Sequence, residues 1–273
     1  MSSAGQTGLT RRRAILGAAA GAALLAMRRS VAAAGVSAEL AIARLLAGRK
    51  AIASDRVRIE LPYTFDYGLS VPLGVAVDTP MTDADHVRRI DVFADGNPLP
   101  EVLSLYFQPG NGPARAATRF RLAKGNHRIS AITEMSDGTL LTSSAEVVAM
   151  SEGCGGNSGI EPDAPEPQPV PRINVPGEVG RGDLVDVPSM ISHRMESGFR
   201  IDTVGNPLPR RIINRMECQY AGRLIFAADL APAIAANAYL KFPLLAVETG
   251  DIAFAWYEDG GAVYRATRRI EVD

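Results

Sequence analysis

The sequence has few residues that could bind a metal. Its 273 residues include only two cysteines, Cys154 and Cys218, and three histidines, His86, His127 and His193. No pair of cysteines stands at metal-ligand spacing, and the histidines are far apart in the chain. We therefore expect no metal and no other cofactor.

Alternation of helical and strand-like segments is also absent, which disfavours a doubly wound α/β fold. The patterns that are present are short runs of alternating apolar residues, separated by Gly, Pro, Asn and Asp turn signals. Such spacing is typical of β-sandwiches. The runs cover residues 57–61, 71–77, 90–94, 102–107, 117–122, 127–133, 140–150, 172–175, 184–190, 210–220, 223–227, 238–246, 250–257 and 262–272.

One segment has the features of a short helix. Ser37 is a good N-cap residue, the apolar positions up to Leu46 have helical spacing, and Gly48 is a stop signal. With this helix, the strand pattern predicts an all-β protein with two sandwich domains, at residues 37–152 and 172–273. A length of 273 residues is enough for two such cores.

The first 34 residues differ from the rest in charge and composition. A run of three arginines, Arg11 to Arg13, precedes an apolar stretch at 14–27, and three alanines follow at 32–34. This order is typical of a cleavable twin-arginine (Tat) export signal, which predicts a periplasmic protein. The alternative, a membrane anchor, is disfavoured because the stretch is shorter than the ~20 apolar residues that a span needs. No second run of that length follows, so we expect no membrane span after cleavage.

The chain lacks an excess of positive charge. Its 29 basic and 30 acidic residues give −1, and without the five arginines of residues 1–34 the remaining 24 basic residues give −6. An acidic surface does not attract nucleic acid or an anionic membrane. Neither is an expected partner.

Residues 153–171 have no apolar periodicity. Glycines gather in the first part of this segment and prolines in the second, which predicts a linker that is loose at first and extended later. Cys154 stands in the glycine-rich part, between Gly153, Gly155 and Gly156. Glycine beside a cysteine frees the backbone and removes bulk, so that the thiol could enter a narrow cleft of another protein.

Two other interpretations of Cys154 stay open. The segment could be a plain linker with an incidental cysteine, or Cys154 could form a disulfide with Cys218. Against the disulfide, Cys218 lies in a strand-like run with an inward-facing pattern, where we expect it to act as a small apolar residue. Catalysis by Cys154 itself is disfavoured, because no base is adjacent and Glu152 opposes the thiolate.

Two further positions have alternatives. His193 stands among charged residues at the end of a predicted strand, and we favour a structural role over a binding role. Trp256 and Tyr257 are adjacent in an alternating run, and we expect both in the core and not in a stacking platform.

The chain resembles SoxY and SoxZ, the two subunits of the sulfur-oxidation carrier, joined in one polypeptide. The SoxY-like motifs are Asp83-Ala84-Asp85-His86-Val87, Asn97-Pro98-Leu99-Pro100-Glu101-Val102, Thr118-Arg119-Phe120-Arg121-Leu122-Ala123-Lys124 and Gly153-Cys154-Gly155-Gly156. The SoxZ-like motifs are Ile191-Ser192-His193-Arg194-Met195-Glu196-Ser197-Gly198, Phe226-Ala227-Ala228-Asp229-Leu230 and Trp256-Tyr257-Glu258-Asp259-Gly260.

The resemblance implies two immunoglobulin-like domains and a non-catalytic carrier in which Cys154 holds thiosulfate-derived sulfur covalently. It also implies periplasmic partners, a cytochrome that attaches the substrate oxidatively and a hydrolase that releases sulfate. His193 matches a motif position without an assigned role.

Two features differ from the family pattern. The family arm has two glycines before its cysteine and usually ends the SoxY chain, whereas Glu152 precedes Gly153 here and the chain continues. A negative charge near the thiol would repel thiosulfate. Fused carriers of this type also occur beside quinoprotein dehydrogenases. The alternative to a sulfur carrier is therefore an adaptor for such a dehydrogenase, which holds no covalent cargo.

Overall fold

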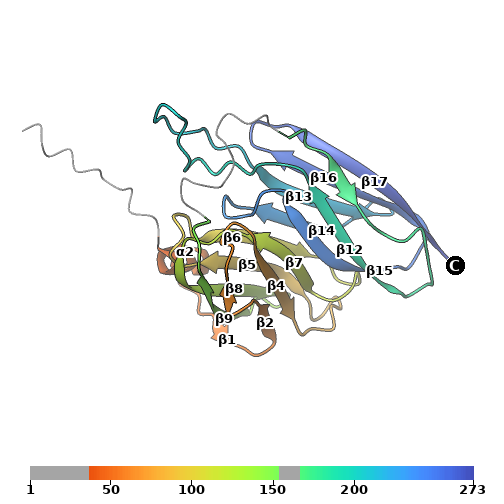
Figure 1. The fold of residues 1–273 in the computed structure, drawn as a ribbon. Coiled ribbons are helices and arrows are strands. Elements are labelled where there is room, and N and C mark those ends of the chain that lie inside the picture. The colour runs from red at the N-terminus through yellow and green to blue at the C-terminus, as the bar shows by residue number, and fades with distance from the viewer. Residues whose placement is uncertain (1–36, 154–166) are drawn as a thin grey trace, which may run out of the picture. The chain divides into compact units, whose positions relative to one another are not determined.

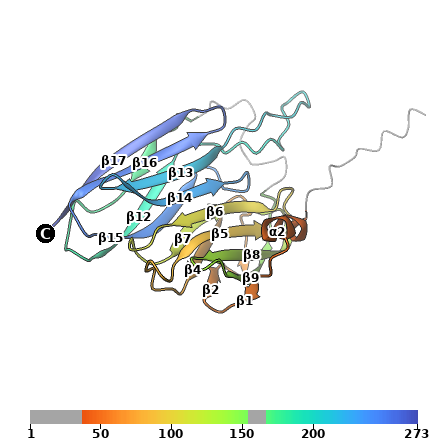
Figure 2. The same ribbon diagram turned by 180° about the vertical axis from the view of Figure 1, so that it is seen from behind.

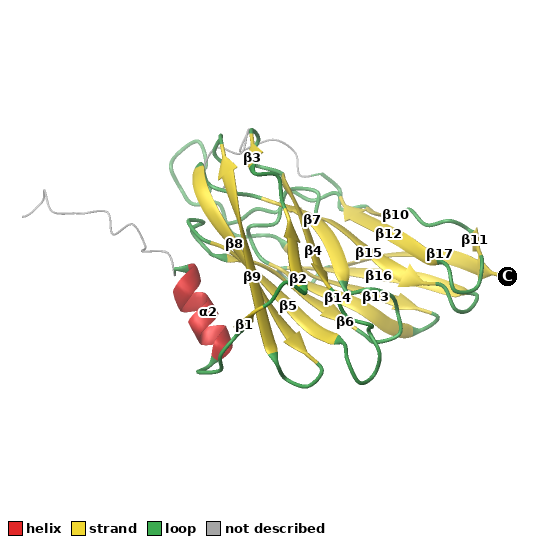
Figure 3. Ribbon diagram, turned by 90° about the horizontal axis from the view of Figure 1, so that it is seen from below, coloured by secondary structure: helices red, strands yellow, loops and turns green. Residues whose placement is uncertain are grey.

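The computed structural model describes residues 37–153 and 167–273, which are almost entirely β-strand (Figures 1 and 3). In this part of the chain, no helix is long and apolar enough to cross a membrane. We call residues 37–153 the N-terminal half and residues 167–273 the C-terminal half.

The predicted helix is confirmed as α2 (Ala38–Leu46). The Ser37 hydroxyl accepts a hydrogen bond from the Leu40 N–H at 3.2 Å, which satisfies one of the free donors of the first turn. The helix ends because Ala47 adopts the left-handed conformation, one residue before the expected stop at Gly48. Ala41 of α2 packs on Phe93 and Ile132, so the helix covers part of one sheet.

Most predicted strands are present, with ends that differ by a few residues. The N-terminal half contains β1 (Ile52–Ala53), β2 (Val57–Glu60), β3 (Thr64–Phe65), β4 (Val71–Val77), β5 (Val87–Ala94), β6 (Glu101–Phe107), β7 (Arg115–Phe120), β8 (Gly125–Met135) and β9 (Leu140–Ala149). The C-terminal half contains β10 (Pro171–Ile173), β11 (Glu178–Val179), β12 (Leu184–Ile191), β13 (Ile213–Tyr220), β14 (Arg223–Leu230), β15 (Tyr239–Leu245), β16 (Gly250–Glu258) and β17 (Val263–Val272).

The strands form two sheets, and each sheet runs through both halves (Figure 2). The larger sheet has the order β1-β9-β8-β5-β6-β14-β13-β16-β17-β11, with β3 also paired to β9. The smaller has the order β10-β12-β15-β7-β4-β2. The all-β sandwich fold is therefore confirmed, and the halves are joined by strand pairing as well as by the linker.

The seam between the halves lies where β6 pairs antiparallel with β14 and β7 with β15. In the larger sheet, the pairing runs from Leu103 opposite Leu230 to Phe107 opposite Phe226. The ring of Phe226 lies 5.3 Å from that of Phe107, in an edge arrangement, and stacks on Phe242 at 4.1 Å. Aromatic pairs of this kind stabilise the folded state by more than the burial of their apolar area alone would give. One apolar core therefore continues across the seam.

Trp256 is fully buried, as the alternating pattern predicts. The prediction for Tyr257 was wrong, because successive residues of a strand face opposite sides of the sheet. Tyr257 lies on the outer face, where its hydroxyl donates to Glu217 Oε2 at 2.9 Å.

Candidate functional site at the root of the Cys154 segment

Three of the predicted site residues, Cys154, Gly155 and Gly156, lie outside the described residues. Gly153 is the last described residue before them and is buried. The site that the structure does show is the place where this segment leaves the sandwich. We call it the arm root and define it as Gly68, Leu122 and residues 151–153.

Gly153 packs against the backbone of Gly68. A β-carbon on Gly153 would lie 2.0 Å from the Gly68 carbonyl oxygen and 2.6 Å from that of Leu122. A β-carbon on Gly68 would lie 2.2 Å from the Ser151 carbonyl oxygen. Neither glycine has a positive φ, so the reason for glycine at both positions is the close approach of two backbones.

Hydrogen bonds fix the arm root to the neighbouring loops. The Leu122 N–H donates to the Gly68 oxygen at 2.9 Å. The Ser151 hydroxyl accepts from the Gly68 N–H at 3.1 Å and donates to the Asp66 oxygen at 2.7 Å. The Glu152 carboxylate accepts from the Lys124 N–H at 3.2 Å, so it is held against the sandwich. The chain is thus anchored up to Gly153.

Arg121, directly before Leu122, reaches into the C-terminal half. Its Nη1 donates to the Met195 carbonyl and its Nη2 to the Arg194 carbonyl, both at 2.8 Å. The Arg121 carbonyl accepts from Asn97 Nδ2 at 3.0 Å, and the Asn97 Oδ1 accepts from the Ala123 N–H at 3.1 Å. Arg121 is only 7% exposed. Sequence reasoning did not single out this residue, because nothing in the sequence shows which backbone it meets.

His193 is fully buried two residues before Met195. Its Nδ1 accepts from the Met195 N–H at 2.9 Å, so Nε2 carries the hydrogen and donates to Glu258 Oε1 at 3.0 Å. Burial would raise the pKa of Glu258, but hydrogen bonds from His193, Arg211 and Tyr264 outweigh it and hold this pKa below its ordinary value. These contacts support the structural role that the sequence favoured.

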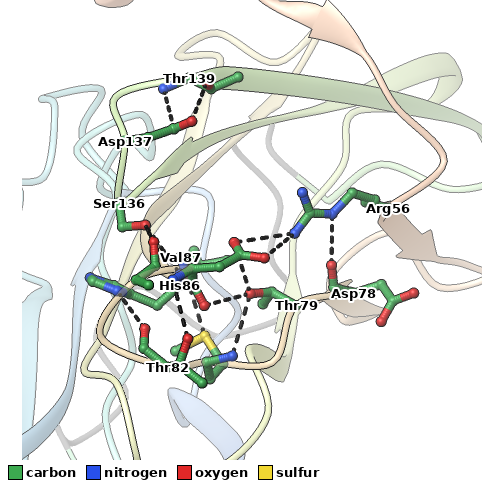
Figure 4. Close-up of polar contacts among 12 residues, drawn as sticks. Arg56, Asp78, Thr79, Thr82, His86, Val87, Ser136, Asp137 and Thr139 are labelled. Atoms are coloured by element: carbon green, nitrogen blue, oxygen red, sulfur yellow. Dashed lines mark hydrogen bonds and ion pairs between the residues drawn. The ribbon is translucent and has the colours of Figure 1, made fainter.

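His86 belongs to a polar cluster at the hairpin between β8 and β9 (Figure 4). Its backbone N–H donates to the Ser136 hydroxyl at 3.3 Å, and its ring Nδ1 lies 2.9 Å from the Thr82 carbonyl oxygen. Gly125 pairs with Ala149 at the arm-root end of this hairpin, whereas Glu134 pairs with Leu140 at the other end. At ~3.4 Å per residue, about 30 Å separates the two ends. His86 is therefore remote from the arm root.

Residues 42–154 match the family of the sulfur oxidation protein SoxY, and residues 173–269 match that of the sulphur oxidation protein SoxZ. Together the two matches cover most of the chain. The chain is a fusion of a SoxY and a SoxZ domain. The SoxY match ends on Cys154 itself, and the N-terminal half is hence the SoxY half and the C-terminal half the SoxZ half.

Solved structures with similar chains include the sulfur carrier protein SoxY from Chlorobium limicola f thiosulfatophilum. That chain is 24% identical, with 41% of this chain and 94% of that chain covered and a TM-score of 0.35. A superoxide reductase (neelaredoxin) from Ignicoccus hospitalis is 18% identical over 44% of this chain and 99% of that one, with a TM-score of 0.31. No curated protein matches the sequence.

Within the described residues of this SoxY–SoxZ fusion, no three His, Cys, Asp or Glu side chains are grouped as metal ligands. Cys218 of the SoxZ half is fully buried in β13, which confirms the expected inward orientation. Burial raises the pKa of its thiol well above the ordinary value. Cys218 is therefore shielded from solvent and unsuited to thiolate chemistry.

Proposed function

We propose that this fusion is a periplasmic sulfur carrier that holds thiosulfate-derived intermediates on the thiol of Cys154. The observation that carries the proposal is the position of Cys154, which ends the SoxY match and directly follows the anchored residue Gly153. SoxY proteins are carriers, and the chain has a single other thiol, which is buried.

The chemistry divides between the carrier and its partners. Loading joins the Cys154 sulfur to the outer sulfur of thiosulfate: the thiol loses its proton, and the pair of electrons passes to a cytochrome partner. The product is a cysteine S-thiosulfonate. A hydrolase partner then adds water across the sulfur–sulfonate bond, which releases sulfate and one proton and leaves a protonated persulfide (S–SH) on Cys154. The carrier supplies the thiol and its presentation, and the partners catalyse.

The position of Glu152 bears on the choice of cargo. Its carboxylate accepts the Lys124 N–H, on the loop between β7 and β8, and so is held at the sandwich. An anion approaching Cys154 therefore meets a carboxylate that is already engaged with a backbone donor, and its repulsion is weaker than that of a fully solvated charge placed along the arm. The repulsion of an anionic cargo is therefore reduced but not removed.

The test is the intact mass of the exported protein from cells grown on thiosulfate, before and after reduction, with the modified peptide mapped. We expect a reducible increment on Cys154 that matches a thiosulfonate or persulfide. The matched variant Cys154→Ser should carry no increment and should fail to support sulfur oxidation. A bare thiol in the wild type, together with co-purification of a quinoprotein dehydrogenase by Cys154→Ser, would instead establish the adaptor.

A further inference from the structure

One side chain of the SoxY half, that of Arg121, connects the arm root to the SoxZ half. The Arg121 guanidinium donates to two successive carbonyls, those of Arg194 and Met195, at 2.8 Å each. Guanidinium is rigid and planar, so two bonds from its fork fix a direction as well as a distance. Buried charge-assisted bonds are also among the stronger ones.

The SoxZ backbone has an unusual conformation at this point. In an extended strand successive carbonyls point to opposite sides, so residues 194 and 195 could not both meet one guanidinium without a turn. Met195 supplies the turn with φ +55°, which is rare for a residue with a side chain. Its N–H is held by His193 Nδ1 at 2.9 Å, and its side chain is fully buried. Strained residues persist where the surroundings fix them.

The other end of this connection is the arm root. Arg121 is joined by one peptide bond to Leu122, whose N–H donates to Gly68 and whose carbonyl lies against Gly153. The Arg121 N–H also donates to the Ala233 oxygen at 2.6 Å, a second bond to the SoxZ half. A shift of Arg121 therefore moves Leu122, the loop residue whose carbonyl packs on Gly153.

From this geometry we propose that Arg121 is a positioning residue, which fixes the arm root, and so the point from which Cys154 is presented, relative to the SoxZ half. His193 supports this contact, because its Nδ1 holds the Met195 N–H and so helps to orient the two carbonyls that Arg121 binds. This inference rests on the proposed carrier function for its meaning, since a fixed root gives partner enzymes one reproducible place to find the thiol. The positioning of the arm root by Arg121 is tested by measurements that do not depend on whether Cys154 carries a sulfur adduct.

The experiment compares Arg121→Lys and Arg121→Gln with Arg115→Gln in the full chain. Arg115 is a matched control because it lies on β7, whose last residue directly precedes Arg121, and because it also reaches the SoxZ half. Its Nη2 meets Asp186 there at 3.2 Å, but the side chains of Arg115 and Asp186 are both about half exposed. Two readouts are used: hydrogen exchange at the Leu122 amide, and the spectrum of a nitroxide spin label on Cys154. Buried Cys218 stays unlabelled in the native protein.

In Arg121→Lys, whose single nitrogen on a flexible stem lacks the rigid planar fork of guanidinium, we expect exchange at Leu122 to accelerate at least ~10-fold relative to core amides, and the label to become more mobile. Arg121→Gln should show a larger effect, and Arg115→Gln none. If Arg121→Gln does not fold, the lysine variant alone decides. Unchanged exchange and an unchanged label spectrum in folded Arg121→Lys overturn the inference, whatever the adduct measurement on Cys154 shows.

Discussion

The Tyr106 hydroxyl of the SoxY half donates a 2.7 Å hydrogen bond to Asp229 Oδ2 of the SoxZ half. Arg215 donates to the other oxygen of Asp229 at 2.6 Å, and its guanidinium lies 5.8 Å from the centre of the Tyr106 ring. Arg89 lies on the same ring at 5.6 Å. A polar and cation–π cluster thus crosses the seam on the outer face of the larger sheet.

We expect Tyr106→Phe to lower the free energy of unfolding by ~1.5 kcal/mol, because it leaves Asp229 without one charge-assisted donor. Tyr63→Phe is the control, since Tyr63 is 71% exposed, and should change stability by less than ~0.5 kcal/mol. Urea unfolding followed by circular dichroism measures both. Because one core crosses the seam, the transition should stay single; two separated transitions would contradict a shared core.

The cluster shows what the sequence could not predict. Alternation at Leu103, Leu105 and Phe107 indicates which face of β6 is buried, but it does not indicate that β14 is the neighbouring strand. That pairing joins residues more than a hundred positions apart, and either half alone would present the same patterns. Two sandwiches were therefore predictable, and their continuous sheets were not.

The arm root shows a similar limit. The run around Cys154 predicts a special segment from composition alone, but the sequence does not reveal that Gly153 meets Gly68, in the loop between β3 and β4. Arg121 looks like any polar residue in an alternating strand, and its partners, two backbone carbonyls, have no sequence signature. The short strands β1, β3 and β11 were missed because two residues are too few to show a period.

The two cysteines should differ sharply in reactivity. Burial raises the Cys218 pKa and excludes reagents, so we expect iodoacetamide to modify one thiol of the reduced native protein and two in denaturant. Intact mass measures the number, and Cys154→Ser should show none in the native state and one after unfolding. In protein that has not been treated with a reductant, protection of both thiols even in denaturant would instead reveal the disulfide between Cys154 and Cys218.

Acid should weaken the fold in part through Glu258. Its carboxylate is nearly buried, and its hydrogen bonds with His193, Arg211 and Tyr264 overcome the burial that would raise its pKa and hold the pKa below 4.5. A lowered pKa stabilises the fold above pH ~4.5, and this stabilisation is lost as the pH falls through the folded value. Glu258→Gln should therefore be less stable at pH 7, by ~2–3 kcal/mol, and the difference from wild type should shrink between pH 5 and 3.

Glu248→Gln is the matched control for this measurement. Glu248 pairs with Arg223, but both side chains are at least 43% exposed. Exposed pairs contribute little to stability. Urea titrations at each pH should show a nearly constant, small difference between this variant and the wild type. A difference for Glu258→Gln that is equally constant with pH would show that ionisation of Glu258 does not stabilise the fold.

Export should depend on the arginines before the apolar stretch. Replacing Arg11, Arg12 and Arg13 by lysine should leave the precursor in the cytoplasm, because a twin-arginine signal is read by a receptor and charge alone does not satisfy it. The control replaces Arg28 and Arg29 by lysine, beyond the apolar stretch, and should still be exported. Fractionation with immunoblotting separates precursor from mature protein. Normal export of the triple variant would refute the proposed route.

Gly153 offers a direct test of whether the arm root is packed or free. If glycine served only to loosen the chain, Gly153→Ala would be mild. The structure instead places its β-carbon 2.0 Å from the Gly68 oxygen, a contact that backbone atoms relieve only by moving. We therefore expect a loss of ~2–3 kcal/mol in urea unfolding. Gly177→Ala is the control, because Gly177 has open space around it and no positive φ, and it should change stability by less than ~0.5 kcal/mol. Equal, small effects of the two substitutions would mean that the root is not packed as described, and Arg121 would then have nothing to position.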